Sequence, residues 1–130
     1  MRKKILIIDD DEDFKIVVTK YLSNFGYEII TAKDGLNGIF KASSNELSPD
    51  LIILDINMAE LDGIETYKFL KENPKLKNIP VIFVSGAVEY SEVVKNIKMN
   101  KNNITFLQKP VALGELVKKA EELLTKKNNV

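Results

Sequence analysis

Residues 51–55 read Leu51-Ile52-Ile53-Leu54-Asp55, a run of four apolar side chains that ends in a carboxylate. Continuous apolar runs of this length are typical of strands buried on both faces of a parallel sheet. A carboxylate at the end of such a strand is costly to bury unless a cation or a hydrogen-bond donor pairs with it. Asp55 therefore predicts a buried strand together with a polar site at its carboxyl end.

Apolar runs of the same kind alternate with helical patterns along the whole chain. Further strands are predicted at residues 5–8, 27–31, 81–84 and 104–107. Apolar residues recur at helical spacing in residues 14–25, 36–40, 64–70, 93–97 and 113–124. Five strands that alternate with five helices predict an α/β fold, with a parallel sheet covered by helices on both faces.

The composition of the chain excludes several classes of binding and catalysis. The chain has 130 residues, which suits one domain, and its 19 basic and 19 acidic residues balance. Zero net charge argues against a large nonspecific nucleic-acid surface, so no direct nucleic-acid binding is expected. The chain contains no cysteine and no histidine, which excludes disulfides, thiolate sites and histidine-based zinc or acid–base chemistry. Without a histidine base, an activated-serine nucleophile at Ser85 is also disfavoured.

The two ends of the sequence bear on the location of the protein and on the extent of its domain. The first apolar run stops at Asp9, which is too short for a signal peptide or a membrane span. A cytoplasmic protein without membrane contact is therefore expected. The polar residues from Thr125 onward are expected to fray. The predicted domain covers residues 1–126, and residues 127–130 form a polar C-terminal tail.

Polar side chains follow three other predicted strands. The cluster Asp9-Asp10-Asp11-Glu12-Asp13 follows the first, and Ser85 and Lys109 follow the fourth and fifth. The carboxyl ends of parallel strands meet at the edge where ligands bind. Two carboxylates about 4 Å apart repel by about 4 kcal/mol at an effective dielectric near 20. A divalent cation relieves this repulsion, and a site with oxygen ligands alone suits Mg²⁺. A neighbouring lysine adds a partner for a phosphoryl group.

Each of these residues also has a more ordinary interpretation. The acids at residues 9–13 could offset the dipole of the following helix, as Glu12 and Asp13 are expected to do. Lys109 could be a surface lysine. Asp55 could be a helix cap or a turn residue, although Asp62-Gly63 is a better turn candidate, with the glycine supplying a positive φ.

Five short motifs, each at a predicted strand end or just after one, make residues 3–126 resemble the receiver domain of two-component response regulators, the CheY-like superfamily. They are Ile7-Ile8-Asp9-Asp10-Asp11, Leu54-Asp55-Ile56-Asn57-Met58, Leu61-Asp62-Gly63, Val84-Ser85-Gly86 and Phe106-Leu107-Gln108-Lys109-Pro110. The resemblance implies a doubly wound, flavodoxin-like sheet of five parallel strands in the order 2-1-3-4-5.

The resemblance also implies catalytic and switching roles. Asp55 would accept the phosphoryl group, Ser85 would donate a hydrogen bond to it, and Lys109 would pair with it. Ser85 and Phe106 would form the switch, with the aromatic ring changing rotamer on activation. The Lys109-Pro110 peptide bond is expected to be cis, a form rare enough to be a deliberate feature of the fold.

Mg²⁺ is the cofactor that the resemblance implies. Asp9, Asp10 and Asp55 would hold the ion, with the backbone carbonyl of Asn57 as a further ligand. Ala59 departs from the family pattern, which usually has proline at this position.

The implied activity is that of a signalling switch rather than a turnover enzyme. A sensor histidine kinase or a phosphotransfer protein would phosphorylate Asp55. The face formed by helix 4, strand 5 and helix 5 would then contact a downstream protein or effector domain. The protein is expected to be a monomer or a weak dimer.

Two alternatives remain from other functional classes. A degenerate receiver would act as a docking module without phosphorylation, but the acidic, hydroxyl and lysine residues of the site are all retained. A phosphohydrolase with an aspartyl-phosphate intermediate would commonly carry a second carboxylate two residues after the nucleophile. Asn57 stands at that position and argues against this alternative.

Overall fold

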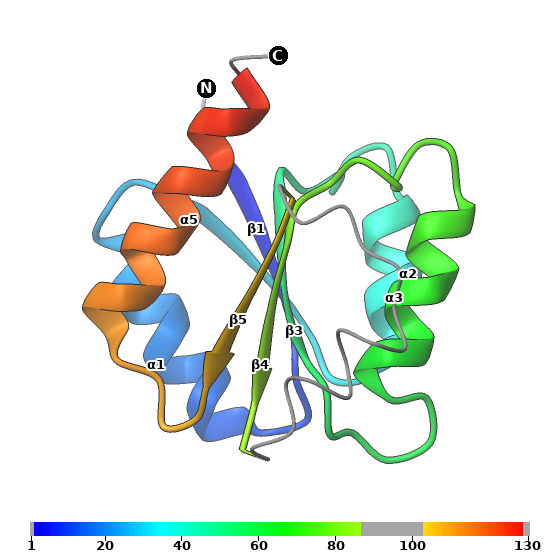
Figure 1. Ribbon diagram of the computed structural model, residues 1–130, viewed down its shortest axis with the longest axis horizontal. Coiled ribbons are helices and arrows are strands. Elements are labelled where there is room, and N and C mark those ends of the chain that lie inside the picture. Colours follow the sequence, from blue (N-terminus) through cyan, green and yellow to red (C-terminus); the bar gives the residue numbers. More distant parts are fainter. Residues whose placement is uncertain (1, 87–102, 129–130) are drawn as a thin grey trace.

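The computed structural model describes residues 2–86 and 103–128 (Figure 1). Within these residues, five strands and four helices follow one another along the chain. They are β1 (Lys4–Ile8), α1 (Glu12–Ser23), β2 (Glu28–Ala32), α2 (Gly35–Ser43), β3 (Leu51–Asp55), α3 (Gly63–Glu72), β4 (Val81–Ser85), β5 (Ile104–Gln108) and α5 (Leu113–Asn128). The helix predicted at residues 93–97 lies outside the described residues.

The strands form one parallel sheet in the order β2-β1-β3-β4-β5, which confirms the predicted topology. Helices α1 and α5 cover one face of the sheet, and α2 and α3 cover the other (Figure 1). The fold is therefore the predicted doubly wound, flavodoxin-like α/β fold. Because all strands run the same way, their carboxyl ends meet at one edge, at the bottom of the view in Figure 1.

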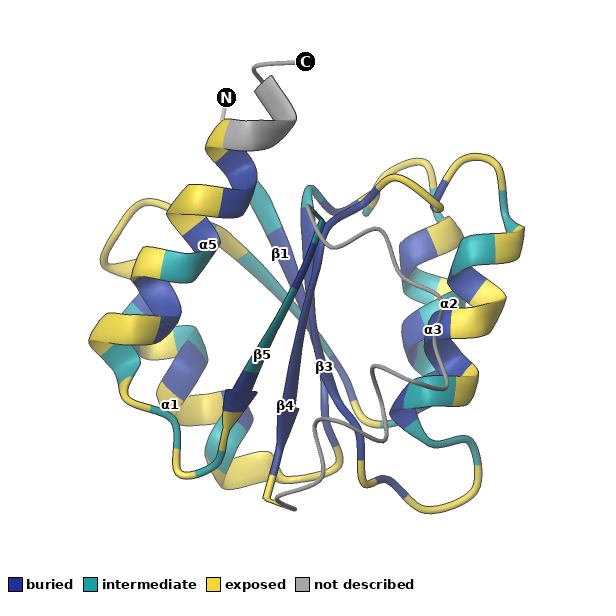
Figure 2. Ribbon diagram, in the orientation of Figure 1, coloured by how far each residue is buried: buried dark blue, intermediate teal, exposed yellow. Residues whose placement is uncertain are grey.

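The sheet is the centre of the hydrophobic core. Strands β1, β3 and β4 are almost wholly buried, whereas β2 and β5 at the edges are partly exposed (Figure 2). Alternate residues of each strand face opposite sides: Ile7 and Ile53 pack under α1 and α5, and Ile8 and Leu54 under α2 and α3. Burial on both faces explains why the central strands read as continuous apolar runs.

Three of the four described helices begin at aspartate caps. The side chains of Asp11, Asp34 and Asp62 accept hydrogen bonds from backbone N–H groups in the first turns of α1, α2 and α3. Glu12 and Asp13 lie in the first turn of α1, where negative charge offsets the helix dipole. The ordinary interpretation of the acidic cluster thus holds for these two residues, whereas Asp9 and Asp10 precede the helix.

The prediction that Gly63 supplies a positive φ is wrong. Gly63 is the first residue of α3, and the positive φ in this loop, 64°, falls at Glu60. A Cβ atom added to Gly63 would lie 2.2 Å from the backbone oxygen of Asp55. Glycine is required here because α3 begins against the end of β3, not because of a turn.

The C-terminal helix is longer than the sequence pattern indicates. Helix α5 continues to Asn128, past Thr125, where fraying was expected. Residue 126 lies inside this helix, and the domain boundary at that residue stays a prediction. Among the described residues, no helix is both long and apolar enough to cross a bilayer.

Candidate functional site

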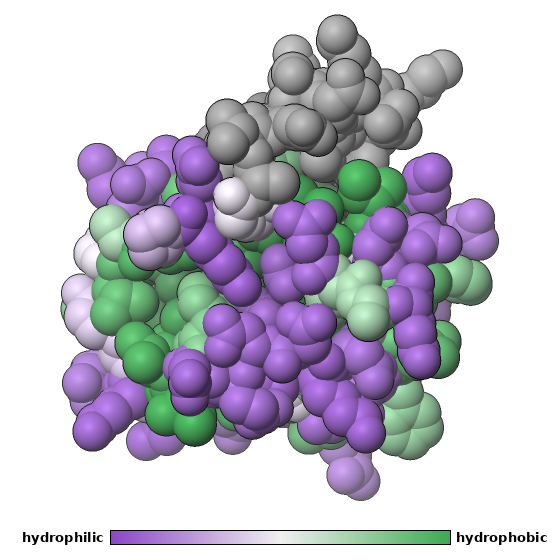
Figure 3. All heavy atoms as spheres, turned by 90° about the horizontal axis from the view of Figure 1, so that it is seen from below, coloured by the Kyte–Doolittle hydropathy of each residue, from purple (hydrophilic) through white to green (hydrophobic). Residues whose placement is uncertain are grey.

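The carboxyl edge of the sheet gathers side chains from four strand ends. Asp55 and Ser85 are the last residues of β3 and β4, and Asp9 and Lys109 follow β1 and β5. Figure 3 looks onto this edge and shows hydrophilic side chains over much of it. Three of these residues are nonetheless buried, with exposed fractions of 0% for Asp9, 4% for Asp55 and 3% for Ser85.

Three carboxylates form a compact acidic cluster. Asp9, Asp10 and Asp55 each offer an oxygen, and these oxygens all lie within 4.8 Å of one another. The Asp11 N–H donates to Asp9 Oδ1 over 2.9 Å, and the Asn57 N–H donates to Asp55 Oδ1 over 3.3 Å. A set of closely spaced oxygen donors with negative charge fits a hard divalent cation such as Mg²⁺. A role for the Asn57 carbonyl as a ligand stays a prediction.

Lys109 places a positive charge beside this cluster. Its Nζ atom lies 2.9 Å from Asp9 Oδ2 and 3.9 Å from Asp55 Oδ1, and 21% of its side chain is exposed. The ammonium group therefore donates a hydrogen bond to Asp9 and lies at the edge of ion-pair distance from Asp55. The Lys109-Pro110 bond is cis, as predicted.

The surroundings of Asp55 change its acidity. Burial raises the pKa of the Asp55 carboxyl to about 7, and the nearby charge of Asp9 acts in the same direction. The Lys109 ammonium group and the hydrogen bond from the Asn57 N–H oppose this rise. A cation bound beside Asp55 would favour the charged carboxylate, which is the form that acts as a nucleophile.

The side chain of Asn57 makes a contact that the sequence did not predict. Its Nδ2 atom donates a hydrogen bond of 3.1 Å to Ser85 Oγ. The loop after β3 is thus linked to the end of β4 beside the acidic cluster. No sequence signal identifies this contact, because Asn57 lies in the loop after β3, Ser85 ends β4, and their side chains meet only in the folded chain.

Phe106 and Lys109 lie on opposite faces of the sheet, in agreement with the alternation of side chains along a strand. The Phe106 ring stacks on Phe83, with centroids 5.2 Å apart and planes 13° apart. Phe83 lies two residues before Ser85 on β4, so Phe106 and Ser85 belong to the same face. Lys109 extends to the other face, where its Nζ lies 4.4 Å from the centroid of the Phe14 ring.

Comparison with known proteins gives one consistent family. The pattern of the response regulator receiver domain matches residues 5–121. The chain is 31% identical over 124 residues to the alkaline phosphatase synthesis transcriptional regulatory protein PhoP of Bacillus subtilis, covering 95% of this chain and 49% of PhoP. It is 31% identical to the transcriptional regulatory protein PrrA of Mycobacterium tuberculosis, covering 97% of this chain and 52% of PrrA. The chain thus spans about half the length of these relatives.

Solved structures share this fold. The chemotaxis protein CheY4 of Vibrio cholerae superposes with a TM-score of 0.81 at 26% identity, covering 95% of this chain and 99% of CheY4. The receiver domain of the Francisella response regulator 1452 superposes with a TM-score of 0.82 at 26% identity, covering 97% and 99% of the two chains. With the family match and the strand order, these similarities show that the chain belongs to the response regulator receiver domains of two-component systems.

Proposed function

We propose that this chain is a phosphorylatable switch in which Asp55 accepts a phosphoryl group from a phosphohistidine of a sensor histidine kinase or phosphotransfer protein. The observation that carries the proposal is the placement of Asp55. It is a buried carboxylate at the end of β3, with two more carboxylates in the same cluster and the Lys109 ammonium group 3.9 Å away. This arrangement suits the binding of a phosphoryl group and a divalent cation together.

In the transfer, an oxygen of Asp55 attacks phosphorus as the phosphorus–nitrogen bond to the donor imidazole breaks. Lys109 pairs with the phosphoryl oxygens, which stabilises the charge that builds on them. Asp9, Asp10 and Asp55 would hold Mg²⁺, with the Asn57 carbonyl as a further ligand. The ion, when bound, supplies positive charge that offsets the negative charge of the phosphoryl group.

The switch consists of Ser85 and Phe106. Ser85 lies at the end of β4 beside Asp55, and its hydroxyl turns to donate to a phosphoryl oxygen. Phe106, stacked on Phe83 on the same face, moves into the space near Ser85. The movement shifts an equilibrium between two states of the helix 4–strand 5–helix 5 face, of which β5 and α5 lie among the described residues.

The partners follow from this role. The phosphoryl donor is a kinase or phosphotransfer protein, and the responding partner is a downstream protein or an effector domain of the same polypeptide. PhoP and PrrA are named as transcriptional regulatory proteins, but the matched region is about half of each. We propose that the receiver domain itself binds neither nucleic acid nor membrane, resides in the cytoplasm, and is a monomer or a weak dimer.

Incubation with acetyl phosphate and Mg²⁺, followed by mass spectrometry of the intact protein, tests the proposal. The wild type should gain one phosphoryl group and Asp55→Asn should gain none. Asp34→Asn is the matched control, because asparagine caps a helix as well as aspartate does, and it should react like the wild type. Continuous release of phosphate would instead support a phosphohydrolase, and no reaction would support a docking module.

A further inference from the structure

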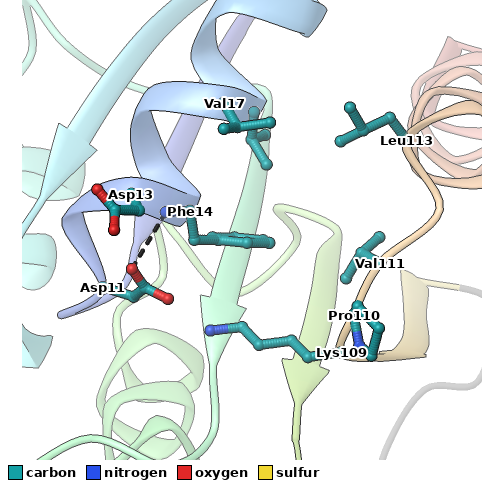
Figure 4. A pocket seen from close by; sticks show the side chains of 9 residues that line it. Asp11, Asp13, Phe14, Val17, Lys109, Pro110, Val111 and Leu113 are labelled. Carbon is teal, nitrogen blue, oxygen red and sulfur yellow. Dashed lines mark hydrogen bonds between the residues drawn. The ribbon is translucent and has the colours of Figure 1, made fainter.

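The aromatic ring of Phe14 lies over the ammonium group of Lys109. The distance from Nζ to the ring centroid is 4.4 Å, well inside the range of about 6 Å for a cation–π interaction. Figure 4 shows the ring above the lysine side chain, with Phe14 supplied by α1 and Lys109 by the segment after β5. The contact joins two parts of the chain that lie far apart in the sequence.

The position of Phe14 is fixed by the start of α1. The Asp11 side chain caps this helix and accepts a hydrogen bond of 3.1 Å from the Phe14 N–H (Figure 4). The Phe14 side chain also packs against the core under α1 and α5. The ring is therefore a preorganised surface, in contrast to the flexible four-carbon stem of Lys109.

Acidic residues that line the same groove would compete with Asp9 and Asp55 for the ammonium group. Phe14 and Lys109 line a groove of about 540 Å³ that is also lined by the acidic residues Asp11 and Asp13. An ammonium group that turned toward either of these acids, or toward solvent, would leave Asp9 and Asp55. The Phe14 ring adds attraction in the position where Nζ lies 2.9 Å from Asp9 and 3.9 Å from Asp55.

We propose that Phe14 is a positioning residue for phosphoryl transfer, whose aromatic face holds the Lys109 ammonium group beside Asp9 and Asp55. The role rests on the proposed function, since Lys109 must reach the phosphoryl oxygens on Asp55. Phe14 itself touches no reacting atom and acts through Lys109 alone. Its aromatic character, more than its volume, is therefore what the reaction requires.

Three variants test this role through the rate of phosphorylation at increasing acetyl phosphate, with Mg²⁺ fixed. Phe14→Leu keeps an apolar side chain but removes the aromatic face, and should lower the maximal rate roughly three- to tenfold. Phe14→Tyr keeps the aromatic face and should restore the rate to within about twofold of the wild type. In a Lys109→Ala background, Phe14→Leu should have no further effect, because the group that it positions is gone.

The opposite results would overturn the role. Equal losses in the leucine and tyrosine variants would show that Phe14 acts through packing alone. If Phe14→Leu lowers the rate of phosphorylation just as much in the Lys109→Ala background, Phe14 acts on a group other than Lys109. A thermal melt checks that each variant folds, and Phe14→Met replaces the leucine variant if that one does not.

Proton NMR gives a second readout that needs no phosphorylation. In the wild type, the ε-methylene protons of Lys109 should be shifted upfield by the Phe14 ring current, and the shift should vanish in Phe14→Leu. Absence of the shift in the wild type would overturn the role of Phe14 alone. A wild type that shows the shift but accepts no phosphoryl group would overturn the proposed function, and with it any role in transfer, while the ring contact would stand.

Discussion

Lys109 donates a hydrogen bond of 2.9 Å from its ammonium group to Asp9, a residue 100 positions earlier in the chain. Asp9 is fully buried, whereas the lysine side chain is 21% exposed. The same ammonium group is 3.9 Å from Asp55. Without a bound cation, Lys109 therefore compensates the innermost carboxylate first, and the proposed phosphoryl acceptor second.

Removal of this lysine should destabilise the protein in the absence of a divalent cation. Lys109→Ala leaves Asp9 buried without its partner, and the free energy of unfolding in EDTA should fall by about 1–3 kcal/mol, less than for a wholly buried pair because Lys109 is partly exposed. Mg²⁺ should reduce this loss. Urea unfolding with and without Mg²⁺ measures both values. Lys119→Ala, which breaks a more exposed pair with Glu122 at 3.8 Å, is the control and should change stability little.

Mg²⁺ affinity should depend on Asp10. Asp10→Ala removes one of three clustered carboxylates, and the affinity measured by NMR titration should fall roughly tenfold or more. The melting temperature in EDTA should rise in this variant, because repulsion with Asp9 and Asp55 is relieved. Asp13→Ala removes an acid outside the cluster, and its Mg²⁺ affinity should match that of the wild type. Equal affinities for Asp10→Ala and the wild type would contradict the proposed metal site.

Stability in EDTA should fall as the pH rises from about 4 to about 7. The pKa of Asp55 is raised from 3.8 to about 7, mainly by burial, so the folded protein retains a proton that the unfolded chain loses in this window. The stabilisation is fully present below the unfolded pKa and is lost as the pH rises through the folded pKa. Relative to Asp55→Asn, the wild type should lose on the order of 3 kcal/mol across the window. Parallel pH profiles in urea unfolding would show that Asp55 is not perturbed.

Gly63→Ala should damage the end of β3. The added Cβ would meet the Asp55 backbone oxygen at 2.2 Å, so the strand end or the start of α3 must shift. We expect a loss of about 2 kcal/mol or more in the free energy of unfolding, with slower phosphorylation of Asp55. Gly114→Ala is the matched control, because a Cβ there meets nothing within 4 Å and alanine favours a helix. Similar stabilities for the two variants would exclude the steric explanation.

Phe106 should change rotamer when a phosphoryl mimic binds. Beryllofluoride with Mg²⁺ should occupy Asp55, draw the Ser85 hydroxyl toward it, and let the ring leave its stacked position on Phe83. Crystal structures with and without beryllofluoride measure the rotamer, and Ser85→Ala should keep the ring in the unliganded position. A ring that stays stacked on Phe83 in the wild-type complex would mean that the signal takes another route.

The sequence by itself determined the sheet and the composition of the site. Burial on both faces requires continuous apolar strands, and these are visible along the chain without knowledge of the fold. Because parallel strands end at a common edge, the polar residues at or just after the strand ends could be assigned to one site. This reasoning placed Asp9, Asp55, Ser85 and Lys109 together. The opposite faces of Phe106 and Lys109 follow from the same local geometry, since side chains alternate along a strand.

Only the tertiary structure decided which of these groups touch. Lys109 prefers Asp9 to Asp55, Asn57 bonds to Ser85, and Phe14 lies over Lys109. The close approach of Gly63 to Asp55 likewise corrects an interpretation based on turn chemistry. Such contacts depend on side-chain directions and on distances of a few ångströms between segments far apart in sequence. The periodicity of the sequence and the ends of the strands determine on which face and at which edge of the sheet a residue lies. The packing of the helices against the sheet determines which side chains that residue contacts.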